Sequence, residues 1–344
     1  MSMSLPYSIQ APAAVVMVRP HAFTPNPQMA ADNAFQTEAA QGQAPAVARA
    51  AYEEVTRAVE QLEAAGVRVH LFEDRGERDT PDSVFPNNWF STHAGGRVAL
   101  HSMAAVNRRR ERRSDVMEML KAEYRVREVI DYSGQERDSL FLEGTGAMVL
   151  DHAARVAYVA RSSRAELRLL ERFCSHFNYE PMVFDTADAT GRPIYHTNVL
   201  MCVATQFALV CTPLLTDAGH AQQLVSRLEE TGHDVIELRP DQITEFAGNA
   251  IELSGFDGRL LALSQRALDS LDAQQRQRIE RSARLLPLSV PTIEMAGGSV
   301  RCMIAGIHLS PREASAEGGV EQTLAPLSGM FSPGRLLLTR PAAP

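Results

Sequence analysis

The sequence has little of what marks several large protein classes. Its 344 residues include only four cysteines, too few for a disulfide framework, and one tryptophan. No apolar run approaches the roughly 18 residues that a membrane-spanning helix needs, and the N-terminal residues lack the basic leader of an export signal. These absences predict a reducing, cytoplasmic setting and no contact with a membrane.

Positive charge is also scarce. The formal net charge is -8 and the pI is about 5.7, so a polyanion such as nucleic acid would be repelled overall. The basic run RRRERR at 108–113 is one short cluster, and we interpret it as a solvated loop or helix start. The charge balance therefore favours a small-molecule partner over nucleic acid.

Two kinds of binding motif are missing as well. A doubly wound nucleotide fold would need a phosphate-binding fingerprint after the first strand, and MVRPHAFTPNP contains none. The pair Gly144 and Gly146 is too incomplete to replace it. No two histidines or cysteines have the spacing of zinc ligands. We therefore expect neither a cofactor nor a metal.

What the sequence does contain is a repeat of about 53 residues. Short apolar strands are predicted at regular intervals, namely Val98–His101, Val156–Val159, Phe207–Cys211 and Leu260–Leu263. Each is followed by an amphipathic stretch that predicts a helix, near 111–124, 164–177, 217–231 and 272–284. Another short strand follows each helix. The pattern predicts an α/β fold of ββαβ-type units.

The two ends of the chain complete each other in this pattern. The strand at Val15–Val18 and the helix at 46–65 have no polar segment before them, and the last polar segment has no such strand and helix after it. Joining them closes a ring of five units and leaves no free strand edge. We therefore predict one closed propeller domain over 1–344, with a short extension (1–12) and an irregular tail (311–344).

A short polar segment precedes the repeating strand in each unit. The segments are PNNWFSTH, FLEGTGAMVL, YHTNVLMCV, EFAGNAIEL and GGSVRCMIAGIHL. Their residues Asn88, Glu143, His196, Asn249 and Cys302 follow one another at intervals of 55, 53, 53 and 53. Corresponding points of five units would meet around one centre. A chance spacing among Gly-rich turns is the alternative.

Three of these residues form a candidate catalytic set. Cys302 follows Gly297-Gly298-Ser299, a turn that would make the thiol accessible, whereas the other three cysteines lie in apolar stretches typical of buried thiols. A thiol nucleophile needs a neighbouring base, and His196 supplies one. Glu143, in an otherwise apolar strand, could stabilise the imidazolium and hold the NH groups of a substrate. A buried structural cysteine, a structural histidine and a structural ion pair remain the alternatives.

Four further polar residues are candidates for substrate binding. Asn88, Asn198 and Asn249 lie beside the presumed catalytic strands, although asparagine more often forms turns. Asp82 lies just before SVFPNN and is a weaker candidate. Asp82 and Arg301 are candidates to bind the α-amino and α-carboxylate groups of an amino-acid substrate, but only because they lie close to the other candidates in sequence. A homodimer is one oligomeric state that the sequence leaves open.

Taken together, these segments resemble the guanidino-group-modifying enzyme superfamily of the pentein α/β-propeller fold, over essentially the whole chain. The superfamily includes arginine deiminases, dimethylarginine hydrolases, succinylarginine dihydrolases and glycine amidinotransferases. The ordered set is most similar to citrulline-utilisation hydrolases, or amidinotransferase-like proteins. The resemblance implies that Cys302 is the nucleophile and that Glu143 and His196 are the acid and the histidine.

The sequence departs from the arginine-handling members at two positions. Where those members carry Asp on the early aromatic strand and often two residues after the histidine, this chain has Asn88 and Asn198. A guanidinium is best bound by carboxylates, whereas an amide matches the donors and the acceptor of a neutral ureido group. We therefore expect a hydrolase that acts on a ureido amino acid such as citrulline through a covalent Cys302 intermediate.

Three rival functions remain at this point. A guanidino hydrolase, a deiminase or an amidinotransferase acting on arginine would fit the superfamily but not the two asparagines. A non-catalytic binding protein of the same fold, like a ribosome anti-association factor, would not need the Cys, His and Glu set. A papain-like protease is disfavoured because there the cysteine precedes the histidine and the asparagine.

Overall fold

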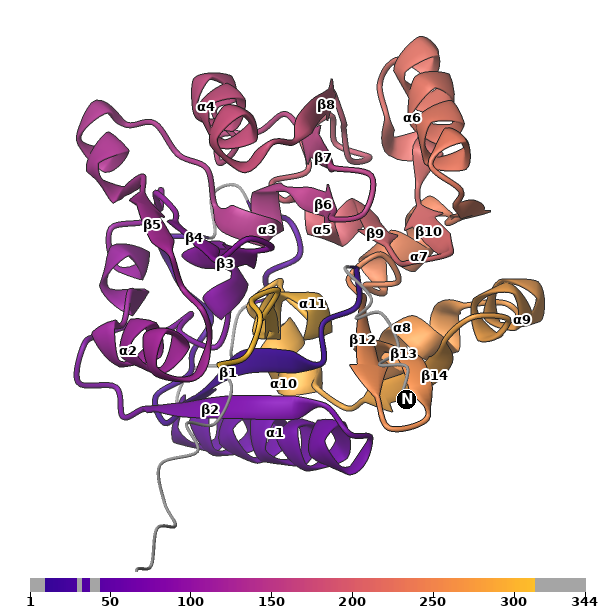
Figure 1. Ribbon diagram of the computed structural model, residues 1–344. Helices are drawn as coiled ribbons and strands as arrows, with labels where there is room; N and C mark the ends of the chain where they lie inside the picture. Colours follow the sequence, from indigo (N-terminus) through magenta and orange to yellow (C-terminus); the bar gives the residue numbers. More distant parts are fainter. Residues whose placement is uncertain (1–9, 30–32, 38–43, 313–344) are drawn as a thin grey trace, which may run out of the picture. The chain divides into compact units, whose positions relative to one another are not determined.

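The computed structural model describes residues 10–29, 33–37 and 44–312. The strands in these ranges form five separate three-stranded sheets, none of which closes on itself (Figure 1). Of the predicted extension only residues 10–12 are described, and of the predicted tail only residues 311–312; the rest lies outside the described residues. The prediction of an α/β fold made of small repeated units is confirmed.

The five sheets share one topology. In each, the middle strand pairs antiparallel with the first strand and parallel with the third. The first strands are β3 (Phe90–His93), β6 (Val149–Asp151), β9 (Met201–Val203), β12 (Ile251–Gly255) and β15 (Ala305–Gly306). The middle strands are β4 (Arg97–Leu100), β7 (Val156–Ala160), β10 (Phe207–Val210), β13 (Gly258–Ser264) and β1 (Ala14–Pro20). The third strands are β5 (Glu128–Asp131), β8 (Glu180–Phe184), β11 (Asp234–Glu237), β14 (Arg284–Leu288) and β2 (Arg68–Asp74).

Each middle strand connects to its parallel partner through a helical segment, because parallel neighbours need a long crossover. The crossover helices are α2 (Ser114–Glu123), α4 (Leu167–Phe177), α6 (Ala218–Glu230), α8 (Gln265–Ser270) with α9 (Ala273–Glu280), and α1 (Ala44–Ala64). In α4 the buried Leu169, Phe173 and Phe177 recur every four residues and form one apolar face. The predicted strands and helices of the repeat are thus confirmed.

The fifth sheet joins the two ends of the described chain. Strand β15 pairs antiparallel with β1, with Val15 opposite Gly306 and Val16 opposite Ala305. The prediction that the first and last elements complete one unit is therefore confirmed. A closed ring of all five units is not shown by these five separate sheets and stays a prediction.

Four of the five polar segments contain single helical turns, and Glu143 and His196 do not lie in the strands expected for them. These turns are η1 (Pro86–Asn88), α3 (Gly144–Ala147), α5 (Thr197–Leu200) and α11 (Val300–Met303). Glu143 and His196 are the residues immediately before α3 and α5. At Gly144 the chain turns with φ of +47°, and a Cβ there would lie 2.4 Å from the carbonyl oxygen of Asn87. Only glycine allows that approach.

The remaining short helices connect these units. They are η2 (Arg108–Glu111), η3 (Ser133–Asp138), η4 (Thr212–Leu214), α7 (Pro240–Thr244) and α10 (Pro291–Glu294). Contacts link the polar turns of different units, since α3 contacts both η1 and α5, and α11 contacts η1. The segments that the repeat predicted to meet therefore do meet.

Candidate active site

The five residues at corresponding points of the repeat lie together. Asn198 and Asn249 each place an amide Nδ2 at 3.3 Å from Sγ of Cys302. His196 contacts Glu143, and Asn88, His196 and Cys302 line one small pocket. His196 and Asn198 share one segment, and Asn88, Glu143, Asn249 and Cys302 each come from another unit of the repeat.

Cys302 lies in the turn of α11 and is buried, with 3% of its surface exposed. The expected accessible thiol is therefore covered in this structure. Gly298 packs against it so closely that a Cβ at Gly298 would lie 3.2 Å from Cβ of Cys302 and 2.8 Å from the ring of Phe85. The sulfur receives two amide donors, an arrangement that stabilises a thiolate more than a thiol.

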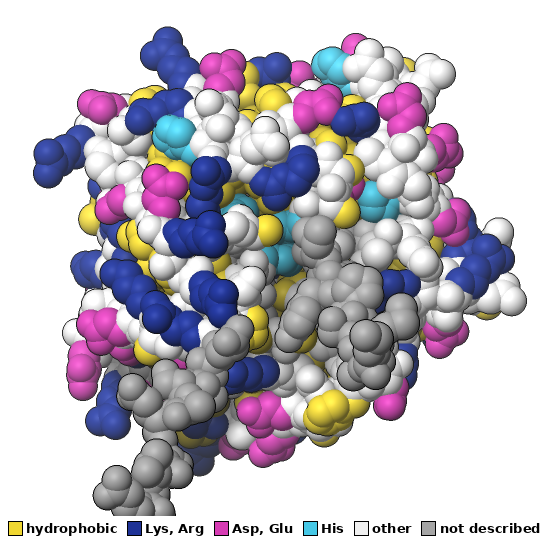
Figure 2. Space-filling model, viewed as in Figure 1, with side chains coloured by type: hydrophobic (Ala, Val, Ile, Leu, Met, Phe, Trp, Pro, Cys, Tyr) yellow, Lys and Arg dark blue, Asp and Glu magenta, His cyan; other side chains and the backbone are white. Residues whose placement is uncertain are grey.

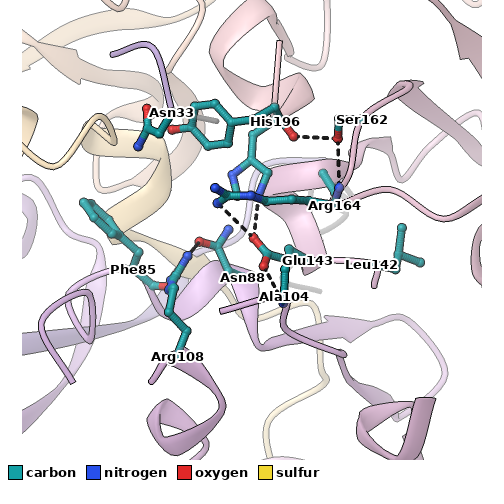
Figure 3. A network of polar contacts seen from close by, with 12 residues as sticks. Asn33, Phe85, Asn88, Ala104, Arg108, Leu142, Glu143, Ser162, Arg164 and His196 are labelled. Carbon is teal, nitrogen blue, oxygen red and sulfur yellow. Dashed lines mark hydrogen bonds and ion pairs between the residues drawn. The ribbon is translucent and has the colours of Figure 1, made fainter. Parts of the chain in front are cut away.

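His196 and Glu143 form a buried hydrogen-bonded pair. Nε2 of His196 donates to Oε2 of Glu143 over 2.8 Å (Figure 3). Because a carboxylate only accepts, Nε2 carries the proton and Nδ1 carries the lone pair. Burial lowers the pKa of His196 despite the opposing effect of Glu143, so the ring is neutral near neutral pH. Nδ1 is then the nitrogen that can accept a proton.

Glu143 has partners for both of its oxygens. Oε1 accepts a hydrogen bond from the backbone N–H of Ala104 over 2.9 Å, and Nη1 of Arg164 lies 3.6 Å from Oε2. Burial alone would raise the pKa of Glu143, but Arg164 and the hydrogen bond from His196 outweigh it, so the pKa lies well below its usual value. Glu143 is a carboxylate that orients His196.

Asn88 is held by a buried arginine. Nη1 of Arg108 donates to Oδ1 of Asn88 over 2.9 Å, while Nε and Nη2 of Arg108 form a bidentate pair with Glu111 at 2.8 and 3.0 Å. Nδ2 of Asn88 is buried and has no hydrogen-bond partner among the described residues. The neighbouring carboxylates outweigh burial and hold the pKa of Arg108 above its usual value.

Asp82 also lines the pocket. Its Oδ2 accepts a hydrogen bond from Nδ2 of Asn26 over 2.8 Å and lies 3.7 Å from Nε of Arg108. Its Oδ1 is buried without a hydrogen-bond partner in the described ranges. The full lining consists of Met29, Asn33, Asp82, Phe85, Asn88, Arg108, Tyr195, His196, Ala296, Gly298 and Cys302.

Sequence reasoning missed two buried arginines. Arg108 and Glu111 belong to the basic run that we interpreted as solvated, yet both are buried; a carboxylate three residues from an arginine was the one available signal. Arg164 packs its guanidinium over the ring of Tyr195 at 4.9 Å, and no local pattern indicated this. On the face drawn in Figure 2, acidic and basic side chains both occur.

Arg301 does not reach this pocket, although it neighbours Cys302 in sequence. Its backbone N–H donates to Oδ1 of Asn249 over 3.0 Å, which orients the amide toward the sulfur. Its side chain lines a different cavity, with His152 and His308. Proximity in sequence was therefore a poor guide for Arg301, whereas Asp82 does line the pocket.

The described residues contain neither a membrane-spanning helix nor a cluster of metal ligands. None of the helices in the described part of the chain is long and apolar enough to cross a membrane. Within residues 10–29, 33–37 and 44–312, no group of three or more His, Cys, Asp or Glu side chains could hold a metal ion.

The chain also matches the profile of a known family. The profile of a family described as N,N dimethylarginine dimethylhydrolase, eukaryotic, matches residues 19–309. No curated protein matches the chain in sequence.

Solved structures share the fold at low identity. The substrate-bound N-terminal domain of ArgZ, an arginine dihydrolase from the ornithine-ammonia cycle in cyanobacteria, gives a TM-score of 0.63 at 16% identity, covering 86% of this chain and 97% of that domain. Unliganded AgrE gives 0.66 at 18% identity, covering 87% of this chain but only 40% of AgrE. DDAH from Pseudomonas aeruginosa, a cysteine-to-serine variant complexed with citrulline, gives 0.56 at 15% identity, covering 86% of this chain and 100% of that one.

Proposed function

We propose that this chain, which belongs to the N,N dimethylarginine dimethylhydrolase family and hence to the pentein guanidino-modifying enzymes, is a cysteine-dependent hydrolase of a ureido amino acid such as citrulline. The family supports a hydrolase that acts on this class of C–N bond. The choice of a ureido over a guanidino substrate comes from this chain's own side chains.

The observation that carries the choice is the orientation of Asn88. A guanidinium can only donate, so Arg108 must take the amide oxygen of Asn88. The group that remains for a ligand is the unpartnered Nδ2, which is a donor. A ureido carbonyl can accept from it, whereas a substrate guanidinium offers only further donors. A buried donor facing a donor would leave both unsatisfied.

Asn198 complements the other side of a ureido group. Its Nδ2 donates to Sγ of Cys302, and its Oδ1 is buried without a partner in the described ranges. That oxygen can accept from the terminal NH2 of the substrate while the same amide holds the sulfur. One donor from Asn88 and one acceptor from Asn198 match the carbonyl and the amine of a ureido group.

The reaction begins at the sulfur. Cys302 loses its proton to Nδ1 of His196, and the thiolate attacks the ureido carbon to form a C–S bond. The carbonyl oxygen takes up the electron pair and is stabilised by Nδ2 of Asn88. The C–N bond to one nitrogen then breaks as the imidazolium, held by Glu143, returns its proton to that nitrogen.

Water completes the turnover. If ornithine leaves first, Cys302 carries a carbamoyl group, and Nδ1 of His196 takes a proton from water as its oxygen attacks the carbon. The C–S bond breaks and the thiolate is restored. The released carbamic acid divides into ammonia and carbon dioxide. If ammonia leaves first, the same hydrolysis releases the products in the opposite order.

Asp82 suits the amino-acid end of the substrate. Burial raises the pKa of Asp82, and an α-ammonium group bound at its unpartnered Oδ1 in the pocket wall would favour the ionised form. The cavity volume beside Cys302 is only about 10 Å³, so the pocket must widen before an amino acid can bind. Asn249 supports the sulfur and is not needed to contact the substrate.

The closed ring, the cellular location, the partners and the oligomeric state belong to the same proposal. The pairing of β15 with β1 and the contacts among the polar turns support a closed ring of five units. A cytoplasmic protein with a small-molecule substrate, no cofactor and no nucleic-acid partner would fit this chemistry. A homodimer stays a prediction.

Arginine or a derivative is the second candidate substrate. The family description names a methylated arginine, and the unpartnered carboxylate oxygen of Asp82 could pair with a guanidinium if the substrate bound in the opposite direction. An amidinotransferase would also require a second amine acceptor. The orientation of Asn88 argues against both.

Steady-state kinetics decide between these substrates. We expect kcat/KM for citrulline, followed by ornithine and ammonia release, to exceed that for arginine by at least about tenfold, which corresponds to one mismatched buried hydrogen bond. Cys302→Ala should be inactive, while Cys174→Ala, which alters another buried cysteine, should retain activity. A preference for arginine would overturn the ureido substrate, and activity in Cys302→Ala would overturn the nucleophile.

A further inference from the structure

A second cavity lies apart from the Cys302 pocket and shares no lining residue with it. Its volume is about 30 Å³, enough for a ligand of a few heavy atoms. The polar side chains in its wall are Gln10, His152, Glu252, Arg301 and His308. Nothing in the proposed reaction uses this cavity.

The cavity is built from the continuations of the catalytic segments. Leu150 in β6, Cys202 in β9 and Glu252 in β12 belong to the first strands that follow Glu143, His196 and Asn249. Strand β9 contacts both β6 and β12. The single turn of α11 serves both cavities, because Cys302 lines one and Arg301 lines the other.

Arg301 carries a positive charge into this wall without a nearby counter-charge. Its side chain is partly buried, Nη1 donates to the carbonyl of Ile304 over 2.9 Å, and no carboxylate of the described residues lies within ion-pair distance. Burial lowers the pKa of Arg301, in contrast to Arg108, whose carboxylate neighbours raise its pKa. An arginine in this state is a ready partner for an anion.

Among the described residues, no other charged group around the cavity pairs with Arg301. Oε2 of Glu252 accepts hydrogen bonds from the backbone N–H of Thr205 at 2.7 Å and from its hydroxyl at 2.5 Å. Oε1 has no hydrogen-bond partner among the described residues, and the charge of the carboxylate is balanced by Arg259, whose Nε lies 3.3 Å away. His152 and His308 stack with ring centroids 3.7 Å apart, and Nδ1 of His152 contacts the hydroxyl of Tyr179 at 2.9 Å. The wall thus combines a cation with two imidazole rings.

We propose that this cavity is a second ligand site, which binds a small planar carboxylate-type anion such as formate, acetate or bicarbonate through Arg301 and the paired His152 and His308. The volume fits an anion of a few heavy atoms without widening, and the flat fork of a guanidinium matches two oxygens of a carboxylate. A bound anion would contact β6, β9 and β12, the strands that follow Glu143, His196 and Asn249.

Titration of the full chain with formate, acetate and bicarbonate tests this site. Ionic strength is held constant with chloride, and binding is followed by calorimetry and by the rise in melting temperature. We expect saturable binding by the wild type, weakened at least about tenfold in Arg301→Gln through loss of a charge-assisted hydrogen bond. Arg137→Gln, which changes an exposed arginine, should bind as the wild type does.

Two further variants keep the result interpretable. His308→Gln should weaken binding by a smaller factor, and it tests the site independently if Arg301→Gln does not fold. Cys302→Ala should bind the anions unchanged, because Cys302 does not line this cavity. Absence of saturable binding, equal affinity in Arg301→Gln, or loss of binding in Cys302→Ala would each overturn the proposal.

Discussion

The guanidinium of Arg108 is hydrogen-bonded to the amide oxygen of Asn88, with Nη1 and Oδ1 2.9 Å apart. Because Glu111 binds Arg108 in a bidentate manner on its other side, the guanidinium is held in place, and so is the amide. The amide of Asn88 therefore presents Nδ2 as its free group. The proposed preference for a ureido carbonyl depends on this arrangement.

Asn88→Asp tests that dependence. The substitution replaces the donor Nδ2 by a carboxylate oxygen, which repels a carbonyl and attracts a guanidinium. We expect kcat/KM for citrulline to fall by about tenfold or more, the effect of losing one buried hydrogen bond, and the ratio of arginine to citrulline activity to rise. Asn178→Asp, at an exposed position, is the matched control. An unchanged substrate ratio would contradict the role given to Asn88.

Glu143→Gln tests the role of the carboxylate. The variant keeps the shape of the side chain but loses the charge that orients His196 and neutralises Arg164. We expect kcat to fall by about 10²-fold with a small change in KM, since the lost interaction acts in the transition state.

The same variant should unfold more readily. Removing one partner of a buried ion pair typically costs about 3–5 kcal/mol, and urea denaturation measures this. Glu118→Gln, on the exposed side of α2, should change neither kcat nor stability. Full activity of Glu143→Gln would show that His196 needs no carboxylate.

Gly146→Ala tests how tightly the site is packed. A Cβ at Gly146 would lie 2.2 Å from Nδ2 of Asn88 and 2.8 Å from Nδ1 of His196, the two atoms that the mechanism uses. We therefore expect kcat/KM to fall by a larger factor than the folding equilibrium constant, which urea denaturation measures. Gly134→Ala is the control, because nothing lies within 4 Å of a Cβ there. Equal activity of the two variants would mean that these atoms are not placed as described.

His101 makes the stability of the fold sensitive to acid. Burial lowers its pKa from 6.5 to about 3, so the unfolded chain takes up a proton near pH 6.5 that the folded chain refuses. The stability that His101 contributes is therefore present above pH 6.5 and is lost as the pH falls from 6.5 towards 3. The slope is about 1.4 kcal/mol per pH unit for this one group.

His101→Gln should remove that slope. Urea denaturation of the variant and of the wild type between pH 7 and about 5 gives the difference directly. We expect the two stabilities to converge as the pH falls. Parallel curves over this range would show that His101 does not remain neutral in the folded chain.

Much of the fold could be predicted because its signals are periodic. Each repeating strand, such as Phe207–Val210, is a run of apolar residues, and the longer crossover helices, such as α4, have an apolar stripe long enough to recognise. The single turns that carry Glu143 and His196 could not be recognised. Four residues are too few to show a helical period, so these positions looked like parts of strands.

The candidate site was predictable where the repeat placed a residue, or where a residue such as Asn198 or Asp82 lay within a few positions of a repeating segment. Register alone brought Cys302, His196, Glu143 and Asn88 to one centre. The burial of Arg108 depends on Asn88 and Phe85, twenty or more residues away, and a run of arginines does not indicate which member turns inward. Arg301 was misplaced because successive residues of a helical turn point in different directions.

Attack of Cys302 on a ureido carbon can be observed directly. Citrulline labelled with ¹³C at that carbon is mixed with the enzyme, the reaction is quenched in acid during turnover, and the digested peptides are analysed by mass spectrometry. We expect a labelled adduct on the peptide that contains Cys302, and none in Cys302→Ser under the same conditions. Turnover of citrulline with the label bound to another residue, or continuing at the wild-type rate in Cys302→Ser, would contradict it.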